Sequence, residues 1–105
     1  MEKFRYYLDD VRKLPDSFDF MVRTAEDAIR SIKLGVVSFI SLDNDLGEGY
    51  TEGKKVAQFI EQAYISGEIE FVDFHPHTNN PVAFEEILQC KRNVYKHKNN
   101  LDNGK

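Results

Sequence analysis

The sequence of 105 residues has only one cysteine, Cys90, so the chain cannot form an internal disulfide. It also has no stretch that is long and apolar enough for a signal peptide or a membrane span. We therefore expect a cytoplasmic protein with no membrane partner. Cys90 follows Leu88 in a predicted helix with no obvious partner base, and we interpret it as a small packing residue.

Internal repeats and low-complexity runs are also missing, and the net charge of −4 gives no general attraction to a polyanion. Long nucleic acid is therefore not an expected partner. Hydrophobic residues make up 41% of the chain, which is ample for one compact core. We predict one domain over residues 1–96 and a polar, disordered tail over residues 97–105.

Strand-like and helix-like segments alternate along the chain, which predicts an α/β layer fold with a parallel sheet. Helices are expected after Thr24 and Thr51, ending near Gly35 and Gly67, and again from Asn80. The expected strands are Phe4–Leu8, Phe18–Val22, Val36–Leu42 and Ile69–Phe74. The third of these is rich in β-branched and aromatic residues, as a central strand covered on both faces should be.

Two helix starts have clear capping residues. Thr24 precedes an apolar pattern of helical spacing with Asp27 in its first turn, and Gly35 follows the last turn. Asn80 and Pro81 form a good start for the last helix, because proline in the first turn loses no hydrogen bond.

Acidic residues follow two of the strands directly. Asp9 and Asp10 come after the first, and Asp43 and Asp45 come after the third. The carboxyl ends of parallel strands meet at one edge of a sheet, where ligands bind in open α/β folds, so we expect these acids to converge there. Their repulsion is unfavourable unless protons, a divalent cation or a basic partner compensates, and the pattern therefore predicts a site.

Carboxylates two residues apart, such as Asp43 and Asp45, can share a face and suit Mg²⁺ or Mn²⁺. A purely structural alternative stays open for both pairs. Asp9 could cap a turn while Asp10 pairs with the basic residues that follow it, and the second pair could form an Asx-turn before the glycine loop.

His77 lies next to a helix start, whose free N–H groups make an anion site. Its side chain titrates near neutrality and could protonate a leaving oxygen. Arg12 could either neutralise the first acid pair or bind a phosphate. His75 is a weaker candidate, because strand alternation can turn it away from the site. Further hydrogen-bond donors follow at Thr78, Asn79 and Asn80.

Three motifs occur together: Tyr7-Leu8-Asp9-Asp10-Val11-Arg12, Ser41-Leu42-Asp43-Asn44-Asp45-Leu46-Gly47 and His77-Thr78-Asn79-Asn80-Pro81. They resemble the cyclic-phosphate-processing receiver domain family over nearly the whole chain, from about Phe4 to Tyr95. The family pattern has Leu-Asp-Asp-x-Arg, Asp-His-Asp-Leu and His-Ser-x-Asn-Pro after its first, third and fourth strands. Here Thr78 replaces serine and keeps the hydroxyl, whereas Asn44 replaces histidine and removes a possible acid or base.

The resemblance implies a small receiver-like (flavodoxin-like) three-layer fold with a short, mostly parallel four-stranded sheet. It also implies a role in processing or recognising a cyclic phosphate on a nucleotide or an RNA end. Carried over to this sequence, it makes Asp9, Asp10, Asp43 and Asp45 the acidic cluster. From the convergence of the motifs we predict that Asp10 and Asp43 bind Mg²⁺ or Mn²⁺ and that Asp9 or Asp45 orients or deprotonates water. His77 becomes the proton donor, and the substrate contacts are Arg12, Thr78 and Asn80.

Other functions remain open at this stage. The same pocket could bind or sequester a cyclic nucleotide without cleaving it, or the acids could be structural in an interaction module. An ordinary receiver phosphorylated at Asp43 fits less well, because no final strand with a lysine follows Asn80. Tyr50 and Phe18 could stack on a base, although Phe18 at a strand start is also a typical core residue.

Overall fold

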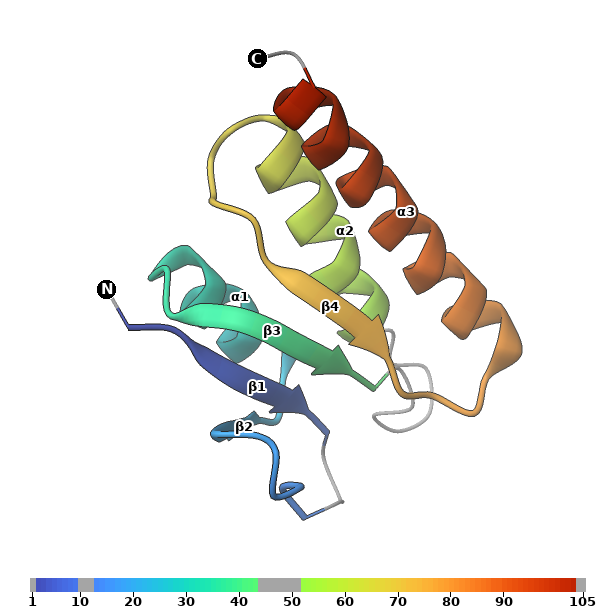
Figure 1. Ribbon diagram of the computed structural model, residues 1–105. Helices are drawn as coiled ribbons and strands as arrows, with labels where there is room; N and C mark the ends of the chain where they lie inside the picture. The colour runs from blue at the N-terminus through green and yellow to red at the C-terminus, as the bar shows by residue number, and fades with distance from the viewer. Residues whose placement is uncertain (1, 10–12, 44–51, 104–105) are drawn as a thin grey trace.

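The computed structural model describes residues 2–9, 13–43 and 52–103. Within these ranges the chain forms four strands and three helices (Figure 1). The strands are β1 (Phe4–Leu8), β2 (Phe20–Val22), β3 (Val37–Leu42) and β4 (Asp73–Pro76). The helices are α1 (Ala25–Lys33), α2 (Glu52–Ile65) and α3 (Pro81–Asn103). The strands are all parallel in the order β2-β1-β3-β4, which confirms the predicted α/β fold and its central third strand.

The path of the chain places α1 and α2 on one face of the sheet. The crossovers from β2 to β3 and from β3 to β4 step in the same direction, so two right-handed crossovers put their helices on the same side. Figure 1 shows α1 and α2 behind the sheet, with α3 alongside α2 and next to β4.

The step from β1 to β2 runs in the opposite direction, so its connection covers the other face. Within its described part, residues 13–19, this connection has no helix. Phe18 from this segment packs against Tyr7 and Phe39, with ring centroids 5.0 and 6.0 Å apart. The third layer expected from the sequence is therefore a loop segment, and Phe18 contacts the sheet rather than a free surface.

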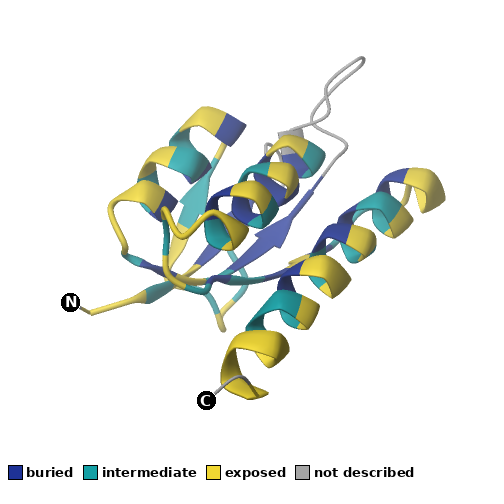
Figure 2. Ribbon diagram, turned by 90° about the horizontal axis from the view of Figure 1, so that it is seen from above, coloured by how far each residue is buried: buried dark blue, intermediate teal, exposed yellow. Residues whose placement is uncertain are grey.

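The main core lies between the sheet and the three helices. Figure 2 shows buried residues in the central strands and on the sides of the helices that face them. Cys90 of α3 belongs to this core, as the sequence predicted. Strand residues with no solvent exposure are Leu8, Ile40, Leu42 and Phe74. No helix in the described ranges has the length and apolar character needed to cross a membrane.

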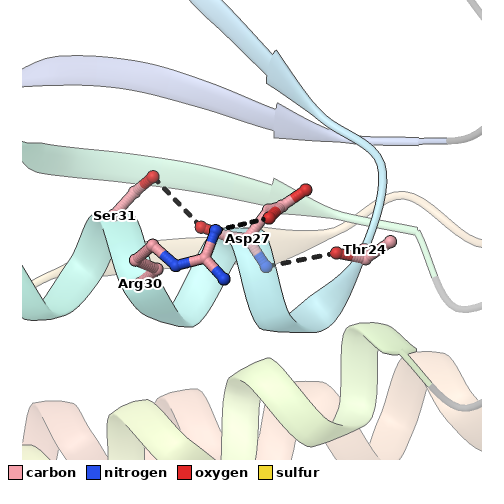
Figure 3. A network of polar contacts seen from close by, with 4 residues as sticks. All are labelled: Thr24, Asp27, Arg30 and Ser31. Carbon is pink, nitrogen blue, oxygen red and sulfur yellow. Dashed lines mark hydrogen bonds and ion pairs between the residues drawn. The ribbon is translucent and has the colours of Figure 1, made fainter.

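Both predicted helix starts are confirmed. Thr24 Oγ1 accepts a hydrogen bond of 3.1 Å from the main-chain N–H of Asp27, and the Asp27 side chain pairs with Arg30 at 2.9 Å (Figure 3). Gly35 follows the helix with a φ of 79°, which favours glycine. Asn80 Oδ1 accepts hydrogen bonds of 3.0 and 3.2 Å from the first turn of α3.

Two strands begin two or more residues later than their sequence patterns predicted. Asp19 accepts a hydrogen bond from the main-chain N–H of Arg5 with its carboxylate, and strand β2 is assigned only from Phe20. Ile69 donates its N–H to Ala63 O, at the end of α2, so the chain joins β3 only from Asp73. A local hydrogen bond thus takes the place of a ladder bond before β4, whereas Asp19 bonds to Arg5 of β1 through both its side chain and its main-chain N–H.

Helix α3 extends through Asn103, so the segment expected to be a disordered tail is helical over residues 97–103. His97 packs edge-on against Tyr64, with centroids 5.5 Å apart. Lys98 lies 5.3 Å from the centre of the Phe71 ring and pairs with Asp102 one turn further along. These contacts stabilise a polar segment whose composition alone favours fraying.

Thr24→Ala should lower the free energy of unfolding by about 1 kcal/mol, because it removes the cap of α1. Thr24→Ser keeps the hydroxyl and is the matched control. Urea denaturation of the three proteins would measure the difference. Equal stability of the alanine variant and the parent protein would contradict the capping role.

Burial, with Glu61 nearby, raises the pKa of the Cys90 thiol from 9.0 to about 11. Because the unfolded thiol ionises first, this group's stabilisation is complete below pH 9 and is lost as the pH rises through about 11. Between pH 8 and pH 10.5 the free energy of unfolding should therefore fall by about 1–2 kcal/mol less in Cys90→Ala than in the parent protein, as measured by urea denaturation. Parallel losses in both proteins would contradict this prediction.

Candidate functional site

Three polar residues follow three adjacent strands at the carboxyl edge of the sheet. Asp9, Asp43 and His77 are the first residues after β1, β3 and β4, respectively. The parallel ladder continues into these positions, because Asp43 N donates to Leu8 O at 3.1 Å and His77 N donates to Leu42 O at 2.9 Å. The register of the sheet therefore fixes the backbone of the site.

The side chains of Asp9, Asp43 and His77 meet at this edge. One carboxylate oxygen from each aspartate and one ring nitrogen of the histidine all lie within 4.8 Å of one another. Asp9 has no exposed surface and Asp43 is 6% exposed, so both carboxylates are buried. Two buried carboxylates this close repel each other, and this favours a proton, a cation or a basic group between them.

His77 supplies a basic group at the acid pair. Its Nε2 lies 3.2 Å from Asp9 Oδ2, and its Nδ1 lies 2.5 Å from the hydroxyl oxygen of Ser41. The ring also stacks on Tyr7, with centroids 4.3 Å apart and an interplanar angle of 7°. Both ring nitrogens therefore have partners, and Nε2 faces the carboxylate of Asp9.

Arg23 brings a positive charge to the site. Its Nη1 donates a hydrogen bond of 3.0 Å to the main-chain oxygen of Asp9, from a position between β2 and α1. The sequence alone predicts no role for Arg23, Ser41 or Tyr7. For Ser41 a signal was present, since it lies two residues before Asp43 and strand alternation places both side chains on the same side.

The donor set fits a divalent cation. Carboxylate oxygens suit Mg²⁺ and Mn²⁺, and an imidazole nitrogen favours Mn²⁺ over Mg²⁺. Asp9 and Asp43 would supply the oxygen ligands, with a ring nitrogen of His77 within 4.8 Å of both. The sequence motifs instead predict Asp10 as the partner of Asp43, and Asp10 lies outside the described residues.

The remaining predicted site residues fall into two groups. Thr78 and Asn80 lie between His77 and α3: Thr78 Oγ1 accepts from Asn80 N at 3.2 Å, and Asn80 caps the helix. Both therefore shape the turn into α3, and their substrate contacts stay a prediction. The other predicted positions, outside the described residues, are Asp10, Arg12 and Asp45, together with Asn44 and Tyr50.

His75 lies apart from the acid pair. Its Nδ1 is 3.3 Å from Lys91 Nζ, and its ring packs edge-on against Phe84 of α3. Partial burial, with the Lys91 charge nearby, lowers the pKa of His75. His77, not His75, is therefore the histidine that the fold brings to Asp9.

Asp43→Asn should raise the free energy of unfolding by about 1 kcal/mol in the presence of a chelator, because it removes one of two buried like charges. Thermal unfolding would measure the change. Asp16→Asn is the matched control, since Asp16 is exposed and the same substitution there should have little effect. A clear destabilisation by Asp43→Asn alone would contradict the proposed repulsion.

A comparison with protein-family models gives one match, to the cyclic-phosphate processing receiver domain, over residues 4–93. The matched range contains all four strands and the residues Asp9, Asp43 and His77. Comparisons with curated proteins and with solved structures gave no significant match. The family name links the chain to the processing of cyclic phosphates, as the sequence motifs implied. The match covers most of the sequence, and the chain therefore belongs to the cyclic-phosphate processing receiver domain family.

Proposed function

We propose that this protein hydrolyses a cyclic phosphate on a nucleotide or an RNA end, in a reaction that depends on Mg²⁺ or Mn²⁺. The observation that carries the proposal is the meeting of buried Asp9 and Asp43 with His77. They meet at the carboxyl edge of a parallel sheet, where ligands bind in open α/β folds. Membership of a family named for cyclic-phosphate processing supports the same substrate class.

The acid pair is the proposed cation site. When bound, a divalent cation would polarise the phosphate and lower the pKa of a coordinated water. Asp43 is the ligand common to the sequence motif and to the described cluster, with Asp9 beside it and Asp10 as a further predicted ligand. Asp9 or Asp45 would accept a proton from the attacking water.

His77 is the proposed proton donor. As the water oxygen bonds to phosphorus, the bond between phosphorus and one ribose oxygen breaks. An imidazolium at His77 would give its Nε2 proton to that oxygen, leaving a phosphate monoester, a free hydroxyl and a neutral imidazole. For this transfer the departing oxygen must replace or join Asp9 Oδ2 as the partner of Nε2. Arg12, Thr78 and the start of α3 would bind the phosphate oxygens.

Binding without cleavage is the second candidate function. Asn44 stands where the family pattern has histidine, and an amide cannot act as an acid or a base. Both ring nitrogens of His77 already have partners, which favours a held imidazole over a mobile proton donor. The same site would then sequester or sense a cyclic nucleotide.

Phosphorus NMR of the purified protein with 2′,3′- and 3′,5′-cyclic nucleotides tests the two functions. With Mn²⁺ we expect ring opening of at least one substrate, and with chelator none. His77→Ala and Asp43→Asn should each lower the rate by about 10²–10⁴-fold, as expected for loss of a proton donor or a metal ligand. Asp16→Asn should leave it unchanged.

A shifted phosphorus signal without ring opening would contradict hydrolysis and favour the binding function. Full activity in His77→Ala and Asp43→Asn would contradict the proposed site. If no cyclic nucleotide binds and Mn²⁺ does not change the melting temperature, the acids are structural and both functions fail.

A further inference from the structure

We propose that Ser41 is a positioning residue of this site, whose hydroxyl holds the His77 imidazole with Nε2 toward Asp9. The inference deepens the proposed function and rests on it for its catalytic consequence. Ser41 would contact neither the substrate nor the cation, and it would act only through His77.

The fold gives Ser41 a fixed place behind the histidine. Ser41 is 7% exposed in the central strand β3, and across the sheet it pairs in register with Tyr7 on one side and His75 on the other. Its hydroxyl oxygen lies 2.5 Å from His77 Nδ1. A buried hydroxyl on a central strand has little freedom to move, so it is a firm anchor for the ring.

Tyr7 and Ser41 restrain different motions of His77. The stack on Tyr7, with an interplanar angle of 7°, fixes the plane of the imidazole. Stacking does not distinguish the two edges of the ring, because a half turn about the bond from Cβ to Cγ keeps the same plane. The contacts of the two ring nitrogens distinguish them: Nδ1 with Ser41 and Nε2 with Asp9.

A half turn of the ring would have a clear chemical consequence. It would place carbon atoms where Nδ1 and Nε2 now lie, so that neither Ser41 nor Asp9 would have a nitrogen partner. Ser41 therefore favours the one orientation in which the histidine faces the acid pair. A hydroxyl can both donate and accept, so it can keep this contact with either tautomer of the ring.

The orientation can be measured without any ligand. Long-range proton–nitrogen NMR of protein labelled with ¹⁵N-histidine reports which ring nitrogens carry a proton, and His77→Gln identifies the signals of His77. In the parent protein we expect one set of His77 signals with a proton on Nε2. In Ser41→Ala we expect these signals to shift and to broaden or split, because the ring samples both orientations.

Two variants separate positioning from a general loosening of the strand. Ser38 lies on the same strand, and its hydroxyl donates to Phe4 O at 3.0 Å. Ser38→Ala removes this hydroxyl and should leave the His77 signals unchanged. Ser41→Thr keeps a hydroxyl and should preserve them. In the phosphorus assay with 2′,3′-cyclic AMP and Mn²⁺, Ser41→Ala should lower kcat about tenfold with little change in KM, whereas Ser38→Ala should not.

His77 signals that do not change in Ser41→Ala would overturn the inference, as would equal changes in Ser38→Ala. If Ser41→Ala does not fold, Ser41→Cys, which also removes the hydroxyl, takes its place, and unchanged His77 signals in that variant would overturn the inference. Absence of ring opening in the parent protein would contradict the proposed hydrolysis, while the NMR comparison would still test the role of Ser41.

Discussion

The parallel ladder that joins β1, β3 and β4 is the constraint on which the site depends. Its bonds continue past the strand ends, from Asp43 N to Leu8 O and from His77 N to Leu42 O. They bring three polar side chains from distant parts of the sequence to one edge. A slip of one residue between two strands would turn a whole row of side chains to the other face. The apolar core, which fixes the register, therefore also fixes the site.

This arrangement has a cost in stability. The carboxylates of Asp9 and Asp43 are buried within 4.8 Å of each other, and burial and repulsion both oppose two negative charges there. His77 and Arg23 offset part of the cost through their contacts with Asp9. In the proposed function, a cation at this edge would compensate both charges.

Local patterns predicted much of this fold. Strand β1 and the caps at Thr24 and Asn80 follow from residues close together in sequence, and the meeting of Asp9 with Asp43 follows from their places directly after two parallel strands. The contact of Ser41 and Tyr7 with His77 does not, because it depends on which residues become neighbours across the sheet. The helical end of α3 was missed for the same reason: contacts of its last turns with α2 and the segment before β4 stabilise a polar sequence.

Anomalous diffraction from crystals grown with Mn²⁺ and inorganic phosphate would test most directly whether the converging residues form one cation site. The account predicts an anomalous peak within coordination distance of both the Asp9 and Asp43 carboxylates, and no such peak in Asp43→Asn crystals. A parent structure with no manganese at this edge, or with manganese bound only elsewhere, would contradict it.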